Sequence, residues 1–217
     1  MELFQKILSY VWPFTKHYHS SINGALEVSW INGKKHLNSR NANYSYGKLQ
    51  QVLEFGLDEI GLSNQQNILV LGMGGGSVIS SLRQKFHYSG KITAVEIDPA
   101  IIEIATAEYN IKESNRLTII EADAERFVAN CTEAFDLIIV DLFVDDLVLN
   151  FCFEPAFWRN IDKILQVNGN VLFNAGMNSK QAAGLELIQI ELDKLFHTHV
   201  YTHVLGENTL IIASSKN

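Results

Sequence analysis

From residue 67 onward, short apolar runs alternate with longer amphipathic segments, and this alternation constrains the fold more than any other feature of the chain. Such apolar runs are typical of strands that are buried on both faces of a parallel sheet. We expect strands at 68–71, 92–97, 117–120, 137–140 and 171–173. We expect helices between them at 78–86, 99–109, 124–130 and 155–165. The repetition predicts an α/β fold with a Rossmann-like, doubly wound and mainly parallel sheet.

The end of the chain departs from this alternation. After a helix expected at about 181–196, two strand-like segments, 199–205 and 209–213, flank Gly206-Glu207-Asn208. They predict an antiparallel hairpin. Five parallel strands that end in such a hairpin resemble the sheet of class I methyltransferases rather than that of dehydrogenases.

The first 45 residues have a different pattern. Residues 25–30 alternate like a strand, Asn32-Gly33 is a strong tight-turn signal, and 36–39 provide a return strand. Before this hairpin, Ile7 and Val11 belong to an apolar series at helical spacing. We expect a short helix there that packs on its own domain.

A helix expected at 46–60 and closed by Gly61 begins the second part of the chain. The sequence therefore predicts two units. Residues 1–45 form an N-terminal helix and β-hairpin, and residues 46–217 form a Rossmann-like domain.

Composition limits the partners of the protein. The 217 residues are 47% hydrophobic and 19% charged, which is ordinary for a globular chain. Acidic residues outnumber basic ones by 24 to 17, and this argues against binding to nucleic acid. No stretch approaches the ~20 apolar residues of a membrane span. We expect a soluble, cytoplasmic protein without a nucleic-acid or membrane partner, and the sequence leaves a homodimer open.

A glycine-rich loop follows the first strand of the expected parallel sheet. In such sheets, ligands bind outside the carboxyl ends of the strands. The loop reads Gly72-Met73-Gly74-Gly75-Gly76-Ser77. Glycines allow a tight turn and a close approach to a ligand, and the next helix offers free N–H groups. We assign Gly72, Gly74, Gly75 and Gly76 to cofactor binding.

Carboxylates lie at or after the carboxyl ends of the next two strands. Glu96 can accept hydrogen bonds from both hydroxyls of a ribose, and Asp123 can accept one from the amine of an adenine. We assign their neighbours Ile97 and Ala124 to the same site. Ser77 stands where the dehydrogenase fingerprint requires its third glycine, so adenosylmethionine fits this chain better than NAD.

Four segments together resemble the polyamine aminopropyltransferase (spermidine synthase) family. They are 69–76, 94–98, 121–123 and 135–141, in the family's order and roughly its spacing. The resemblance implies a class I methyltransferase fold that binds adenosylmethionine or its decarboxylated form, without a metal.

The same resemblance implies roles for individual residues. Gly72 and Gly74 would line the methionine side of the cofactor, Glu96 would bind the ribose and Asp123 the adenine. Asp141 would lie beside the reacting amine, and we take it both as a cofactor-binding residue and as the first catalytic candidate. Asp145 and Tyr46 are the next two.

The chain also departs from the family pattern. Gly75 stands in place of the aspartate in the family's glycine loop, and Lys48 in place of the glutamate of its Y-H-E motif. A lysine disfavours a di- or triamine substrate, because like charges at ~4 Å cost several kcal/mol. Loss of the aspartate removes a charge that would repel the carboxylate of ordinary adenosylmethionine.

These departures favour methyl transfer from adenosylmethionine to a small acceptor that the sequence does not identify. Two alternatives stay open: aminopropyl transfer from decarboxylated adenosylmethionine, and a non-catalytic nucleoside-binding domain.

Overall fold

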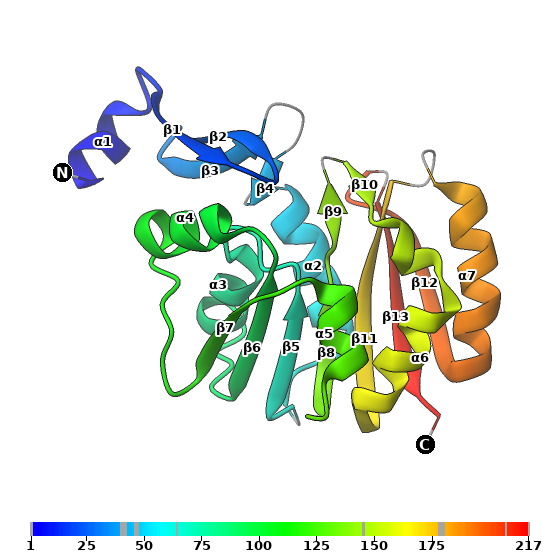
Figure 1. Ribbon diagram of the computed structural model, residues 1–217. Helices are drawn as coiled ribbons and strands as arrows, with labels where there is room; N and C mark the ends of the chain where they lie inside the picture. Colours follow the sequence, from blue (N-terminus) through cyan, green and yellow to red (C-terminus); the bar gives the residue numbers. More distant parts are fainter. Residues whose placement is uncertain are drawn as a thin grey trace.

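A seven-stranded sheet forms the centre of the computed structural model, which describes residues 2–39, 43–45, 48–63, 65–144, 146–177, 181–206 and 208–216 (Figure 1). Its strand order is β12-β13-β11-β8-β5-β6-β7. The strands are β5 (Asn67–Leu71), β6 (Lys91–Glu96), β7 (Leu117–Glu121), β8 (Phe135–Val140), β11 (Leu165–Met177), β12 (Phe196–Val204) and β13 (Asn208–Ser215). Strand β13 is antiparallel to both of its neighbours, whereas the pairs from β11 to β7 are parallel. The predicted sheet, with its closing hairpin, is confirmed.

Helices cover both faces of this sheet. One face carries α2 (Lys48–Ile60), α3 (Ser77–Gln84) and α4 (Pro99–Tyr109), and the other carries α5 (Ala124–Asn130), α6 (Pro155–Ile164) and α7 (Ala182–Leu195). Strand β5 shows why its sequence is continuously apolar. Ile68 and Val70 are buried under α2 and α3, while Leu69 and Leu71 are buried in the cluster that contains α5 and α6.

A smaller antiparallel sheet lies beside α4 at one end of the large sheet (Figure 1). It consists of β1 (Phe14–Ser20), β2 (Gly24–Ile31), β3 (Lys34–Ser39) and β4 (Asn43–Ser45). The predicted hairpin is the β2–β3 pair, in which Ile31 pairs with Lys34. Strand β1 was not predicted, because its sequence is polar and most of its residues are exposed. The division of the chain at residue 45 stays a prediction.

The small sheet docks on α4 through an apolar cluster and a charged one. Leu26, Val28 and Leu37 of the sheet pack against Ile101 and Ile104 of α4. One turn further along α4 lies Glu108, whose side chain is 5% exposed.

Glu108 is surrounded by donors from the small sheet. Its Oε1 accepts hydrogen bonds from Lys16 Nζ at 2.6 Å and from Tyr18 Oη at 2.7 Å, and its Oε2 lies 3.0 Å from Lys35 Nζ. Burial alone would raise the pKa of this carboxyl, but the three donors lower it to about 2. The N-terminal sheet is thus held to α4 by an ionised, partly buried carboxylate.

Helix α1 (Glu2–Leu8) precedes the small sheet. Ile7 is 63% exposed and Val11 is 84% exposed. The prediction that this apolar series packs on its own domain is therefore wrong. The segment is held by polar contacts instead, since Gly33 N donates to Ser9 Oγ at 2.8 Å and Asn32 N donates to Ser9 O at 3.1 Å. Within the described ranges, no helix is long and apolar enough to cross a membrane.

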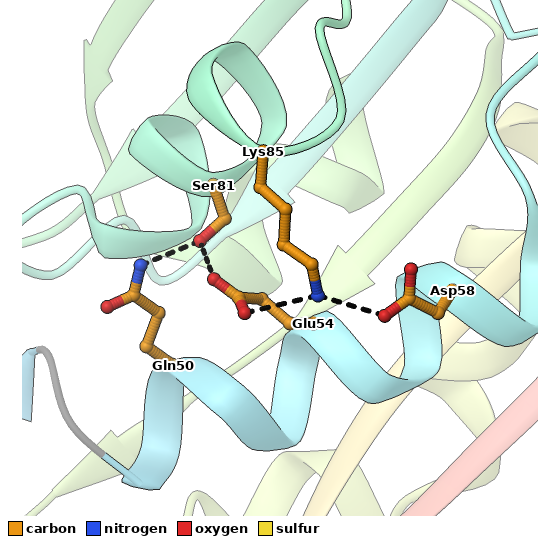
Figure 2. Close-up of polar contacts among 5 residues, drawn as sticks. All are labelled: Gln50, Glu54, Asp58, Ser81 and Lys85. Carbon is orange, nitrogen blue, oxygen red and sulfur yellow. Dashed lines mark hydrogen bonds and ion pairs between the residues drawn. The ribbon is translucent and has the colours of Figure 1, made fainter.

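Polar side chains join α2 to α3 (Figure 2). Ser81 Oγ donates to Glu54 Oε1 at 2.6 Å and accepts from Gln50 Nε2 at 2.8 Å. Lys85 Nζ reaches Glu54 Oε2 at 3.2 Å and Asp58 Oδ2 at 2.9 Å. These contacts fix α2, which contributes one wall of the cavity described next.

Candidate active site

A cavity of about 320 Å³ lies at the carboxyl ends of β5, β6, β7 and β8. It is lined by residues that directly follow each of these strands, as expected for an open parallel sheet. Its volume is in the range of small-molecule sites. Apolar side chains make up much of the wall, and three carboxylates, Glu96, Asp123 and Asp141, face it from the strand ends.

The glycine-rich loop brings its backbone to this cavity. Gly72 has a φ of +85°, and a Cβ there would lie 2.2 Å from the backbone oxygen of Asp141, so only glycine fits. Gly72 and Gly74 line the cavity. Gly75 and Gly76 are buried, and neither is part of the cavity wall. Gly76 instead begins α3 with a φ of +80°.

Glu96 is the last residue of β6, and its carboxylate is held at both oxygens. Gly74 N donates to Oε2 at 2.9 Å, and Asp98 N donates to Oε1 at 3.1 Å. Burial raises the pKa of Glu96, and the two backbone donors act in the opposite direction. A carboxylate oxygen has two acceptor sites, so each can still accept a ribose hydroxyl.

Asp123 lies at the beginning of α5 and also faces the cavity. Its Oδ1 accepts from Arg126 N at 2.9 Å, which makes it the N-cap of the helix. Ala124 lines the cavity beside it. Ile97 lines the cavity as well and is 46% exposed, so it presents an apolar surface to a ligand. The structure thus brings all four predicted nucleoside-binding side chains to one cavity, namely Glu96, Ile97, Asp123 and Ala124.

Asp141 follows β8 directly and faces the same cavity. Its backbone N–H donates to Leu71 O at 2.9 Å, and its Oδ1 accepts from Asn174 Nδ2 at 2.9 Å. Burial raises the pKa of Asp141 to about 6, although the hydrogen bond from Asn174 lowers it. A carboxylate with this pKa is ionised near neutral pH and is still basic enough to accept a proton.

Asn174 is a site residue that the sequence analysis missed. It is 1% exposed, lines the cavity and lies in β11, the strand next to β8. A usable signal was present, because Asn174 directly follows the apolar run 171–173, just as Asp141 follows 137–140.

The rest of the cavity wall is mainly apolar. A short hairpin of β9 (Phe143–Val144) and β10 (Leu147–Val148), which was not predicted, and the 3-10 helix η1 (Asn150–Phe153) contribute to it. Phe143 and Phe151 line the cavity, and α2 adds Leu49 and Leu53. Asp146 adds a further carboxylate from the β9–β10 turn.

Two of the three catalytic candidates from the sequence, Asp145 and Tyr46, lie outside the described residues. Among the residues that the structure describes, no group of three or more His, Cys, Asp or Glu side chains could hold a metal ion.

The strand order, with one antiparallel strand between β11 and β12, defines a Rossmann-like domain of the class I methyltransferase type. A family model described as the spermine/spermidine synthase domain matches residues 51–207, which is more than half of the chain. The chain therefore belongs to the spermine/spermidine synthase domain family.

Individual relatives divide between two chemistries. An eEF1A lysine and N-terminal methyltransferase homolog of Drosophila pseudoobscura pseudoobscura is 33% identical over 106 residues, which cover 48% of this chain and 16% of the relative. A polyamine aminopropyltransferase of Sulfolobus acidocaldarius is 29% identical over 170 residues, which cover 69% of this chain and 55% of the relative. The chain thus spans about half or less of the length of these relatives.

The fold has a close counterpart among solved structures. Human methyltransferase-like protein 13, determined in complex with SAH, superimposes with a TM-score of 0.66 at 22% sequence identity. The match covers 77% of this chain and 82% of that one.

Proposed function

We propose that the protein transfers a methyl group from adenosylmethionine to an amine on a small acceptor. The observation that carries the proposal is the position of Asp141, a carboxylate with a pKa of about 6 at the wall of a mainly apolar cavity. Such a group can orient an amine and accept its proton.

The adenosyl part of the cofactor occupies the side of the cavity that contains Gly72, Gly74 and Glu96. The backbone of the loop approaches the cofactor, and Glu96 accepts the ribose hydroxyls. Asp123 accepts the adenine amine, and Ile97 packs against the ring. The SAH that is bound to human methyltransferase-like protein 13, a fold relative, supports this class of ligand.

Methyl transfer is an in-line displacement at the methyl carbon. The lone pair of a neutral amine forms the new N–C bond while the S–C bond breaks, and its electron pair stays on sulfur as S-adenosylhomocysteine forms. The proton of the amine passes to the carboxylate of Asp141. Holding the amine in line with the sulfonium supplies most of the rate advantage, because it removes the entropy cost of a bimolecular encounter.

Aminopropyl transfer is the second candidate, and family membership favours it. A polyamine carries two or more ammonium groups, and each requires a carboxylate. Outside the predicted nucleoside-binding residues, the described part of the cavity wall contains two carboxylates, Asp141 and Asp146, together with apolar and aromatic side chains. This arrangement suits a single amine on an apolar stem better than it suits a polyamine.

A binding and product assay distinguishes the two candidates. Calorimetry compares adenosylmethionine with its decarboxylated form, and mass spectrometry follows a panel of monoamines, lysine-containing peptides, putrescine and spermidine. We expect ordinary adenosylmethionine to bind at least as tightly as the decarboxylated form, and an acceptor to gain a methyl group. A clear preference for the decarboxylated form, with spermidine made from putrescine, would reverse this assignment. Methylation of a peptide but of no free amine would replace the small acceptor by a protein.

A further inference from the structure

The turn between β1 and β2 reaches the cofactor cavity from the N-terminal sheet. Ile22 and Asn23, in this turn, line the cavity, although the turn connects strands of the small sheet and not of the seven-stranded one. Ser20, the last residue of β1, is 2% exposed at the same place. The turn thus reaches the cavity with Ser20 buried at its base, while Ile22 is 49% exposed.

Two side chains of the turn bind one oxygen of a buried carboxylate. Ser20 Oγ and Asn23 Nδ2 each donate to Asp98 Oδ2 at 2.5 Å. The Ser20 hydroxyl also accepts from the backbone N–H groups of Ile22 and Asn23, at 2.9 and 2.8 Å. Asp98 itself is 0% exposed. The hydroxyl of Ser20 thus stabilises the turn, and Ser20 and Asn23 each direct one hydrogen-bond donor at Asp98.

Asp98 connects this turn to the predicted ribose-binding residue. Its Oδ1 accepts from Ala100 N at 2.9 Å, which caps α4, so the second oxygen is not needed for the cap. Its backbone N–H donates to Glu96 Oε1 at 3.1 Å, and Gly74 N holds the other oxygen of Glu96. Asp98 therefore connects the turn to the carboxylate of Glu96, and Glu96 is in turn hydrogen-bonded to the glycine loop.

Attachment of the small sheet to α4 does not by itself require these contacts. The apolar cluster around Leu26 and the ionised Glu108 already hold the sheet further along the helix. Two short hydrogen bonds to one buried carboxylate oxygen, placed beside the cavity, indicate a role in the site.

We propose that Ser20 and Asn23 are positioning residues of the cofactor site, which hold Asp98 and, through its backbone N–H, the carboxylate of Glu96 against the ribose hydroxyls. The inference rests on the nucleoside site of the proposed function but not on methyl transfer. It makes the N-terminal sheet part of the cofactor site.

The test compares two pairs of variants. Ser20→Ala and Asn23→Ala each remove one donor to Asp98. Thr15→Val removes a 2.9 Å contact with Ser29 in the same sheet, and Glu108→Gln weakens the other attachment of the sheet; both serve as controls. Calorimetry measures the binding of methylthioadenosine and of its 2′-deoxy and 3′-deoxy analogues, and thermal unfolding is recorded for every variant.

We expect the Kd for methylthioadenosine to rise about tenfold in Ser20→Ala and in Asn23→Ala, and to change less than about twofold in the controls. Removing a ribose hydroxyl weakens binding to the parent protein. The same removal costs less in Ser20→Ala, because the contact with Glu96 is already impaired and the two changes are then not additive.

Three results would overturn the inference. The first is an unchanged Kd in both turn variants, and the second is an equal loss of affinity in the control variants. The third is a loss of affinity on removal of a ribose hydroxyl that is the same in the parent and in Ser20→Ala. A parent that binds methylthioadenosine but methylates nothing overturns the proposed function alone. A parent that binds no adenosyl compound overturns both.

Discussion

Asn174 donates a hydrogen bond from Nδ2 to Oδ1 of Asp141 at 2.9 Å, and the pair joins two neighbouring parallel strands at the cavity wall. The amide orientation is fixed from its other side, because Gly176 N donates to Asn174 Oδ1 at 3.2 Å. A donor held in this way favours the charged form of the carboxylate.

The first prediction concerns the pH dependence of kcat/KM. Asp141 must be ionised to accept a proton, so kcat/KM of the parent should fall as the pH drops through about 6. Asn174→Ala removes the hydrogen bond that lowers the pKa of Asp141, so the fall should begin at a higher pH. Asn170→Ala, on the same strand but bonded to Ser214, should leave the profile unchanged. A profile that is identical in Asn174→Ala and the parent would contradict this role for Asn174.

The second prediction is that Asp141→Asn separates binding from chemistry. The amide keeps the size of the side chain and much of its hydrogen bonding but is not basic. Turnover of the acceptor should fall by about 10²-fold or more, while calorimetry with S-adenosylhomocysteine should give nearly the parent affinity. Unchanged turnover would make Asp141 a structural residue, and Asp145 and Tyr46 would become the next candidates.

The site residues that could be predicted lie at, or a few residues after, the carboxyl ends of apolar strands. Glu96 and Asp141 lie at the carboxyl ends of parallel strands, because the direction of the chain places them there. This placement does not depend on long-range contacts elsewhere in the molecule. Asp98 caps α4, because Ala100 N donates to its side chain and Pro99 begins the helix.

Ser20 and Asn23 could not be found by that reasoning. They lie 78 and 75 residues before Asp98, their partner, and the strand that carries Ser20 has no apolar alternation to predict it. Their place in the site depends on how the small sheet docks on α4. Docking is a long-range contact that local sequence patterns do not encode.

The third prediction tests the ribose contact. Glu96→Ala should reduce the affinity for methylthioadenosine by about 1–3 kcal/mol, because ribose hydroxyls would lose their acceptor inside the cavity. Glu121 pairs in register with Glu96 on the neighbouring strand but is exposed and does not line the cavity. Glu121→Ala is therefore the matched control and should bind as the parent does. Equal affinity in Glu96→Ala and Glu121→Ala would remove the ribose assignment.

The fourth prediction concerns the contacts between α2 and α3 (Figure 2). Ser81 is 3% exposed, so Ser81→Ala leaves Glu54 and Gln50 without a buried partner and should lower the free energy of unfolding by about 1–2 kcal/mol. Lys85 is 44% exposed, so Lys85→Ala should cost less than about 1 kcal/mol. Urea unfolding measures both, and a larger loss in Lys85→Ala would contradict this order.

The last prediction is that Glu108 makes stability depend on pH in the acid range. Its folded-state pKa of about 2 lies below its ordinary value of 4.5, so the stabilisation is fully present above about pH 4.5 and is lost as the pH falls toward 2. Glu108→Gln should therefore be less stable than the parent by about 2 kcal/mol at pH 7, and the difference should close on acidification. Glu27→Gln, on the same sheet and 49% exposed, should behave like the parent throughout. Urea unfolding at a series of pH values measures the difference, and a gap that stays constant down to pH 2 would show that Glu108 contributes by packing and not by its charge.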